Sequence, residues 1–267
     1  DFTGRSINEI NLYSTEMSSA LCSIDRVSAS ANMNNRLSEA IVEAYKSTNG
    51  APISFELMLK CYQSRMKDAN NDDSISSVLK QLVNAHIFES EDKVSLIDDS
   101  YIIKMDGYPK DGPIAKAIVY FLMSKLNNIY ELLDKQAVND EVVQIRHFSI
   151  IDEAHYMLDF DNRPLRNLIT VGRNKGLSII LATQNMSSFK SKGFDFYANA
   201  QYPLIMKQQT IDDKVIKDLF GVSGQELQEI RTAIAGLQKG ELIIKDQMAF
   251  ALGMGNKYKK INVTHLI

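Results

Sequence analysis

The chain has 267 residues, of which 45% are hydrophobic, and its formal net charge at pH 7 is −3. This length suits one large domain or two modest ones, and the charge excludes a protein that binds nucleic acid through a basic overall composition. Cys22 and Cys61 are far apart in the sequence, which predicts reduced thiols in a cytoplasmic protein, both as small core residues. No apolar run reaches about 18 residues and there is no signal peptide, so we expect no membrane span.

The first part of the chain is predicted to be a mainly helical insertion, residues 7–97, after a strand tail and turn at residues 1–6. Apolar side chains recur in it at spacings of three and four residues, which favours amphipathic helices. The predicted helices cover residues 35–45, 55–66 and 75–85. Their core-facing side chains are expected to be Leu37, Ala40, Ile41, Ala44, Leu57, Met58, Cys61, Tyr62, Val78, Leu79 and Leu82. Ser54 would cap the second helix, and Asp73 or Ser74 the third.

Residues 86–96 follow two of these helices as a short strand and a charged turn, an order typical of a winged-helix-like module. Such modules often bind DNA, which requires several positive charges facing phosphates. Here only Lys80 and Lys93 stand against five acids, Asp72, Asp73, Glu89, Glu91 and Asp92. We therefore favour packing or protein contact over DNA recognition for the insertion.

The region from residue 98 onward is predicted to be an α/β core. A strand is expected at residues 101–106, a loop at 107–113, and a long helix at 114–135 that packs on a sheet. The next strand is expected at residues 147–151. Such a strand, loop, helix and strand form a right-handed βαβ unit by default.

The C-terminal part is predicted to add a short helix, a sheet strand, two helices and a β-hairpin. These elements cover residues 189–197, 201–207, 212–220, 223–231 and 239–252, respectively. Three lysines near the end, Lys257, Lys259 and Lys260, are expected to lie in a solvated tail, because three charges contribute little to DNA binding alone.

Polar residues follow two short apolar runs in the middle of the chain. The run at residues 147–151 ends in Asp152 and Glu153, and the run at residues 177–182 ends in Thr183 and Gln184. Short apolar runs of this kind predict buried parallel strands, and ligands of open α/β sheets bind at the carboxyl ends of such strands. A helix at residues 163–171 and a turn at 172–176 join the two runs.

Each of these residues has an ordinary explanation when taken alone. Paired acids after a strand are commonly a solvated strand end or a helix cap, and Gln184 is a common type of loop residue. Arg173, in the turn, would be a surface or salt-bridging arginine. His155 is expected in the first turn of a helix and not as a metal ligand, because no second His or Cys accompanies it. The joint arrangement is what points to a site.

Three motifs carry a resemblance to a known family: Ile-Ile-Asp-Glu-Ala-His at residues 150–155, Gly-Arg-Asn-Lys-Gly at 172–176 and Leu-Ala-Thr-Gln at 181–184. In this order they resemble the Walker B half of a RecA-like P-loop ATPase of the HerA/FtsK type, over residues 98–255. The resemblance implies a mostly parallel sheet flanked by helices, with residues 1–6 and 98–267 as a partial ATPase core and a C-terminal hairpin.

The resemblance also assigns roles. Asp152 and Glu153 would line the ATP site. Asp152 would hold Mg²⁺ through water, and Glu153 would polarise the attacking water. Gln184 would sense the γ-phosphate. Arg173 would act in trans on the nucleotide of a neighbouring subunit.

The chain contains no Gly-x-x-x-x-Gly-Lys-Ser/Thr motif, so it lacks the loop that grips phosphates in this class. Its first residue is Asp1 and not Met. We expect the loop to lie upstream in a longer parent, and we expect this chain alone neither to bind ATP tightly nor to hydrolyse it.

The resemblance implies an ATP-driven DNA translocase or helicase-like motor. It would form a homo-oligomeric ring, a hexamer in this family, and work in DNA processing or defence. A HerA-like ATPase of phosphorothioation-dependent DNA restriction is one candidate, and other restriction or translocation subunits are then expected partners. Alternatives are a type IV secretion or conjugation ATPase, or a non-catalytic module that keeps the fold. A superfamily-2 helicase is disfavoured, because that class usually has Ser-Ala-Thr where this chain has Ala182, Thr183 and Gln184.

Overall fold

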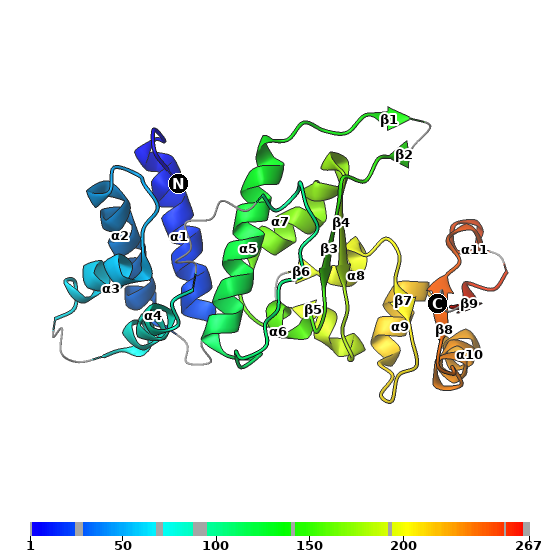
Figure 1. Ribbon diagram of the computed structural model, residues 1–267. Coiled ribbons are helices and arrows are strands. Elements are labelled where there is room, and N and C mark those ends of the chain that lie inside the picture. Colours follow the sequence, from blue (N-terminus) through cyan, green and yellow to red (C-terminus); the bar gives the residue numbers. More distant parts are fainter. Residues whose placement is uncertain are drawn as a thin grey trace. The chain divides into compact units, whose positions relative to one another are not determined.

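The computed structural model describes residues 2–24, 29–67, 72–87, 95–139, 142–191, 194–253 and 255–263. It has a mixed α/β fold with two compact units. The first consists of Asp1–Ser149 and Asp159–Ile179, and the second of Ile150–Leu158 and Ile180–Ile267. The α/β fold class expected from the sequence is confirmed: parallel strands are accompanied by helices, and an antiparallel hairpin lies near the C-terminus (Figure 1).

Four helices open the first unit, α1 (Ile7–Ile24), α2 (Ala31–Ser47), α3 (Phe55–Gln63) and α4 (Ser74–Asn84), and each packs against the next. The expected stripe on α2 is confirmed, since Leu37, Ala40, Ile41 and Ala44 are fully buried. Helix α1 was not predicted, because serines and asparagines interrupt its apolar pattern. Ser18 shows how the core accepts them: its buried hydroxyl donates to Oδ1 of Asn34 at 2.7 Å. The wing-like residues 88–94 lie outside the described residues.

The two cysteines, Cys22 and Cys61, are free and buried among these helices, as expected. Burial raises the pKa of the Cys22 thiol to about 12. Burial also raises the pKa of Cys61. Both thiols therefore remain protonated at neutral pH and act as small core side chains.

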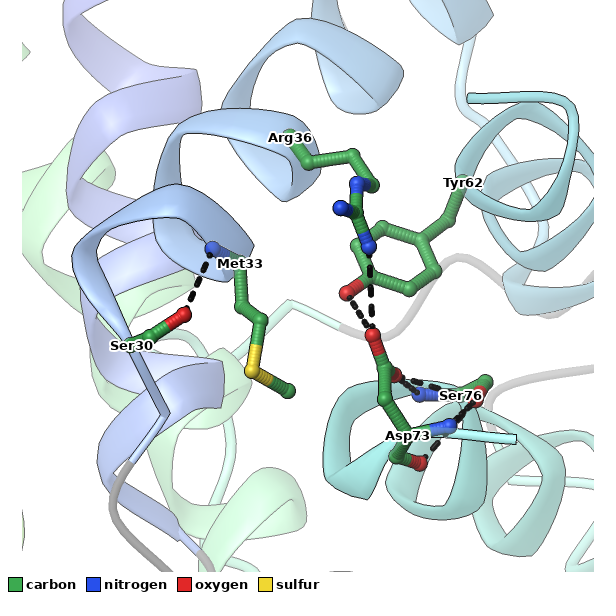
Figure 2. A network of polar contacts seen from close by, with 6 residues as sticks. All are labelled: Ser30, Met33, Arg36, Tyr62, Asp73 and Ser76. Carbon is green, nitrogen blue, oxygen red and sulfur yellow. Dashed lines mark hydrogen bonds and ion pairs between the residues drawn. The ribbon is translucent and has the colours of Figure 1, made fainter. Parts of the chain in front are cut away.

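The N-terminus of α4 is held by a network around Asp73 (Figure 2). Its Oδ1 accepts the Ser76 backbone N–H at 2.9 Å, and Oδ2 accepts the Tyr62 hydroxyl at 2.6 Å and Nη1 of Arg36 at 3.3 Å. Burial pushes the pKa of Asp73 up, but the hydrogen bonds from Ser76 and Tyr62 and the charge of Arg36 outweigh it and hold the pKa below its usual value. The network ties α2, α3 and α4 together.

Replacing Asp73 with alanine is expected to destabilise the chain by about 1–3 kcal/mol, because a helix cap and two further hydrogen bonds are lost. The folded-state pKa of Asp73 is lowered, so its stabilisation is present at neutral pH and is lost as pH falls through that pKa. Urea unfolding at several pH values measures both effects, with Asp72→Ala as the control, because Asp72 pairs with Lys80 at the surface. A destabilisation that stays constant into acid would contradict this account.

Helix α5 (Pro113–Leu132) matches the long helix predicted at residues 114–135, and it packs against α1, α4 and α7 (Arg163–Val171). The strand predicted at residues 101–106 is wrong, since residues 101–105 belong to no strand and Ile102 is 90% exposed. An apolar run becomes a strand only where a neighbour takes its backbone hydrogen bonds, and none of the described strands pairs with this run. The predicted βαβ unit therefore lacks its first strand.

Strands β3 (His147–Ile151) and β4 (Leu177–Leu181) form the central pair, as predicted. Arg146 N–H donates to the Gly176 carbonyl where the strands begin, and Ala182 N–H donates to the Ile151 carbonyl where they end, so they run parallel. The prediction of buried strands is wrong, because Phe148 and Ile150 of β3 are 57% and 69% exposed and Ile180 of β4 is 42% exposed. Alternate side chains of a strand point to the same face, so Phe148 and Ile150 lie together on an exposed face of β3.

The middle of the chain also contains several short elements. They are β1 (Val138–Asn139), β2 (Val142–Val143), α6 (His155–Leu158), η1 (Gly172–Lys175), η2 (Met186–Phe189), β5 (Lys190–Ser191), β6 (Phe194–Asp195) and α8 (Phe196–Asn199). The single helix predicted at residues 189–197 is therefore wrong. Strands β5 and β6 pair antiparallel in its place, and Asp195 caps α8 by accepting the Ala198 N–H at 2.9 Å.

The C-terminal part is an antiparallel sheet of β7 (Leu204–Ile205), β8 (Glu241–Lys245) and β9 (Tyr258–Asn262), in the order β7-β8-β9. Ile205 and Ile243 share a buried core with α9 (Asp213–Phe220) and α10 (Gly224–Ala235). Asp212 caps α9, because its Oδ1 accepts the N–H groups of Lys214 and Val215.

The hairpin is confirmed, but its second strand is β9 and not residues 248–252, which form helix α11 (Gln247–Leu252). The carboxylate of Asp246 accepts the N–H groups of Met248 and Ala249, and this cap starts a helix where a strand was expected. The prediction that three lysines lie in a solvated tail is also wrong. Lys257, Lys259 and Lys260 form ion pairs with Glu226, Asp246 and Glu241, respectively.

Within the parts of the chain that are described, every helix is too short or too polar to cross a lipid bilayer.

Candidate functional site

The acidic turn after β3 has a distinctive backbone. Glu153 has a φ of 50°, in the left-handed region that residues with a Cβ seldom adopt. Oδ1 of Asp152 accepts the Glu153 N–H at 2.8 Å, and Ala154 N–H donates to the Ala182 carbonyl at 2.8 Å. The turn is thus fastened to the residue that follows β4, and both acids lie at the carboxyl ends of the parallel strands.

Gln184 reaches Glu153 directly, since its Nε2 donates to Oε1 of Glu153 at 2.5 Å. Of the three side chains that the sequence assigned to one edge, Gln184 therefore contacts Glu153, and Asp152 contacts the Glu153 backbone; all three residues belong to the second unit. Their roles in catalysis stay predictions, because geometry alone shows only that they meet.

His155 and Thr183 join this group, which the sequence did not predict. Nδ1 of His155 lies 3.4 Å from Oε2 of Glu153 and 3.4 Å from Oγ1 of Thr183. His155 begins α6, as expected, and spacing alone gave no sign that its ring turns back toward the strand ends. The only feature of the sequence that could have indicated this contact is that His155 follows Glu153 by two positions.

The arrangement fits a magnesium ion held through water. Asp152 is exposed, and one of its oxygens closes the turn. Mg²⁺ usually takes one or two carboxylates and completes its shell with water and phosphate oxygens. The described residues contain no group of three metal-ligating side chains, so the other ligands of the ion would have to be water molecules or phosphate oxygens.

Arg173 belongs to the first unit, where it is exposed on η1 between α7 and β4. The turn that carries it is anchored by its neighbour Lys175, whose Nζ donates to the carbonyls of Tyr130 at 2.6 Å and Glu131 at 2.9 Å. These carbonyls close the last turn of α5, where a positive charge is favourable. The structure thus fixes the backbone of the turn and leaves the Arg173 side chain at the surface.

Gly176, which ends this turn, has a φ of 82°, and a Cβ there would lie 2.7 Å from the Gln144 carbonyl oxygen. Gly176→Ala is therefore expected to destabilise the chain by about 2 kcal/mol or more, from backbone strain and the clash together. Gly240 is a matched control, because its φ is also 82° but its nearest contact would be 3.6 Å away. Gly240→Ala should destabilise the chain through backbone strain alone, by about 1 kcal/mol. Equal losses in urea unfolding would contradict a role for the clash.

Comparison with known proteins bears on the fold of the chain. Among solved structures, the chain is similar to VirB4 of Thermoanaerobacter pseudethanolicus, with a TM-score of 0.58 and 16% identity, over 97% of this chain and 69% of that one. No family model matches the sequence, and no curated protein matches it. At this identity the likeness shows a shared fold and nothing finer.

Proposed function

We propose that this chain supplies the hydrolytic half of a nucleotide site in an ATP-driven motor of the P-loop class. The observation that carries the proposal is the contact between Gln184 and Glu153, beside Asp152, at the ends of two parallel strands. A fold shared with VirB4 supports it independently of the motifs.

In this proposal, Mg²⁺ bound to ATP would neutralise charge on the phosphates and leave the terminal phosphorus open to attack by water. Asp152 would hold the ion through a water molecule, and Glu153 would accept the proton of the attacking water. Gln184 would donate to the terminal phosphate. Arg173 would add positive charge to the site of a neighbouring subunit in a homo-oligomeric ring. A phosphate-gripping loop must come from sequence outside these 267 residues.

Two kinds of motor have specific support. The motifs at residues 150–155, 172–176 and 181–184 favour DNA translocation, and a role in phosphorothioation-dependent DNA restriction stays a prediction from the sequence. The fold likeness to VirB4 favours a type IV secretion ATPase equally well.

ATP hydrolysis by the full-length protein, with and without DNA, tests the proposal. Asp152→Asn is expected to remove most of the hydrolysis, while Glu229→Gln, which alters an exposed surface pair with Gln225, should leave it intact. A DNA motor should be stimulated by DNA, and the stimulation should fall as salt is raised. A rate of ATP hydrolysis that does not change when DNA is added would favour a type IV secretion ATPase. Equal rates in Asp152→Asn and the unaltered protein would overturn the proposed function.

A further inference from the structure

The start of α7 is fixed by buried polar side chains. Residues 159–163 form a connector that follows α6 and includes the first residue of α7. Lys116 of α5 is only 3% exposed, and its Nζ donates to Oδ2 of Asp159 at 3.0 Å. Asn162 is also 3% exposed, and its Oδ1 accepts the Leu165 N–H at 3.2 Å, which caps α7. Two almost completely enclosed side chains therefore define where α7 begins.

Helix α1 of the helical insertion holds the same connector. Glu16, Ser19 and Ser23 are three and four residues apart, so they lie on one face of α1. Ser19 Oγ donates to Oδ2 of Asp161 at 3.1 Å, and the Asp161 N–H donates to Ser23 Oγ at 2.9 Å. Oε1 of Glu16 lies 2.8 Å from Nη1 of Arg163. One face of α1 thus contacts the connector through three side chains.

Helix α7 links the connector to Arg173. It continues directly into η1, and the position of the exposed Arg173 side chain depends on the backbone of that turn. At this far end, Nζ of Lys175 donates to two carbonyls near the end of α5. The segment from α7 to η1 is therefore held at its start by α1 and at its end by α5. Because a packed helix moves as a rigid element, a shift of α1 would displace the arginine turn.

We propose that α1 is the positioning element for Arg173, and that its three connector-facing side chains act on the arginine through α7. The inference rests on the proposed function in one respect, which is that Arg173 serves the nucleotide of a neighbouring subunit. It assigns the helical insertion a part in that role, because the insertion sets where the arginine lies. A misplacement of about 1 Å can lower the rate of a reaction by about 10²-fold.

The structural step can be tested on the chain itself, without nucleotide, by backbone hydrogen exchange. Ser19→Ala removes the hydrogen bond to Asp161, and the N–H groups of α7 are then expected to exchange about tenfold faster while α3 and α4 keep their protection. Ser18→Ala is the matched control, because the Ser18 hydroxyl donates to Asn34 of α2 and not to the connector. It should leave the exchange of α7 unchanged. Unaltered protection of α7 in Ser19→Ala, or an equal loss in Ser18→Ala, would overturn the proposal.

The functional step needs the full-length protein and a charge reversal with its rescue. Glu16→Arg places two arginines together, and kcat for ATP hydrolysis is expected to fall about tenfold with KM unchanged, because the arginine acts on the chemical step. Adding Arg163→Glu restores the ion pair and should restore the rate, since a glutamate is favourable in the first turn of a helix. If Glu16→Arg does not fold, Ser19→Ala carries the same prediction on a smaller change. An unchanged kcat in both variants would contradict a positioning role.

Mixed rings identify which residue the defect passes through. Glu16→Arg subunits should regain activity with Glu153→Gln subunits, which keep a well-placed Arg173, and should regain none with Arg173→Ala subunits. Recovery in neither mixture would mark a general structural defect and sink the idea. The exchange measurement involves no nucleotide, so it can fail while the full-length protein still hydrolyses ATP. Conversely, a full-length protein without ATP hydrolysis would leave the exchange rates of α7 as they are.

Discussion

Glu153→Gln is expected to lower ATP hydrolysis by the full-length protein by about 10²- to 10⁴-fold while ATP stays bound, because a general base contributes a factor of that size. The introduced amide keeps an oxygen that can accept the Gln184 hydrogen bond, so the local geometry should survive. What is lost is the ability to take a proton from water. The effect is therefore expected in the rate of the chemical step and not in binding.

Single-turnover hydrolysis and the nucleotide content of the purified variant measure the two quantities separately. Glu229→Gln, an identical change on the exposed face of α10, is the control. Turnover that stays within a few-fold of the unaltered protein would remove Glu153 from the role of base. Loss of bound nucleotide together with turnover would indicate a binding role in its place.

Arg173→Ala is expected to lower hydrolysis by about 10³-fold or more, if its charge stabilises the transferring phosphate as arginines in trans do. A site between subunits would need Glu153 from one subunit and Arg173 from the next. Rings mixed from Arg173→Ala subunits and Glu153→Gln subunits should then recover activity, because some interfaces contain both native residues.

The recovery can be measured as ATP turnover against the ratio of the two inactive variants. Arg166→Ala is a suitable control, since Arg166 lies on α7 nearby in the sequence and pairs with Asp161 at 2.9 Å. Mixtures no more active than the sum of their parts would show that Arg173 does not act across a subunit boundary.

Local patterns predicted much of the fold, because their physical causes are local. The stripe of α2, the caps at Ser54 and Asp73, and the strands β3 and β4 are each encoded within about ten residues, and the structure contains all of them. The errors arose where a partner distant in sequence decides the outcome. Residues 101–105 have strand-like composition without a pairing strand, and β8 pairs with β9 beyond an unexpected helix.

The site divides in the same way. Asp152, Glu153 and Gln184 could be placed together from the sequence, because neighbouring parallel strands end at the same edge. The contact of His155 with Glu153 and Thr183 could not, since it depends on a left-handed residue in the turn, and no spacing rule predicts that for a glutamate. Arg173 lies in a glycine-bounded turn as the sequence suggested, and its role across subunits stays a prediction.

The buried sulfhydryls of Cys22 and Cys61 have a practical consequence. Alkylating dyes react with thiolates, and burial keeps both groups protonated, so the native chain should take up little label at neutral pH. A cysteine introduced at an exposed position would then be the main site of attachment. Pairs of such dyes, one on each compact unit, could report by fluorescence energy transfer whether the distance between the two units changes.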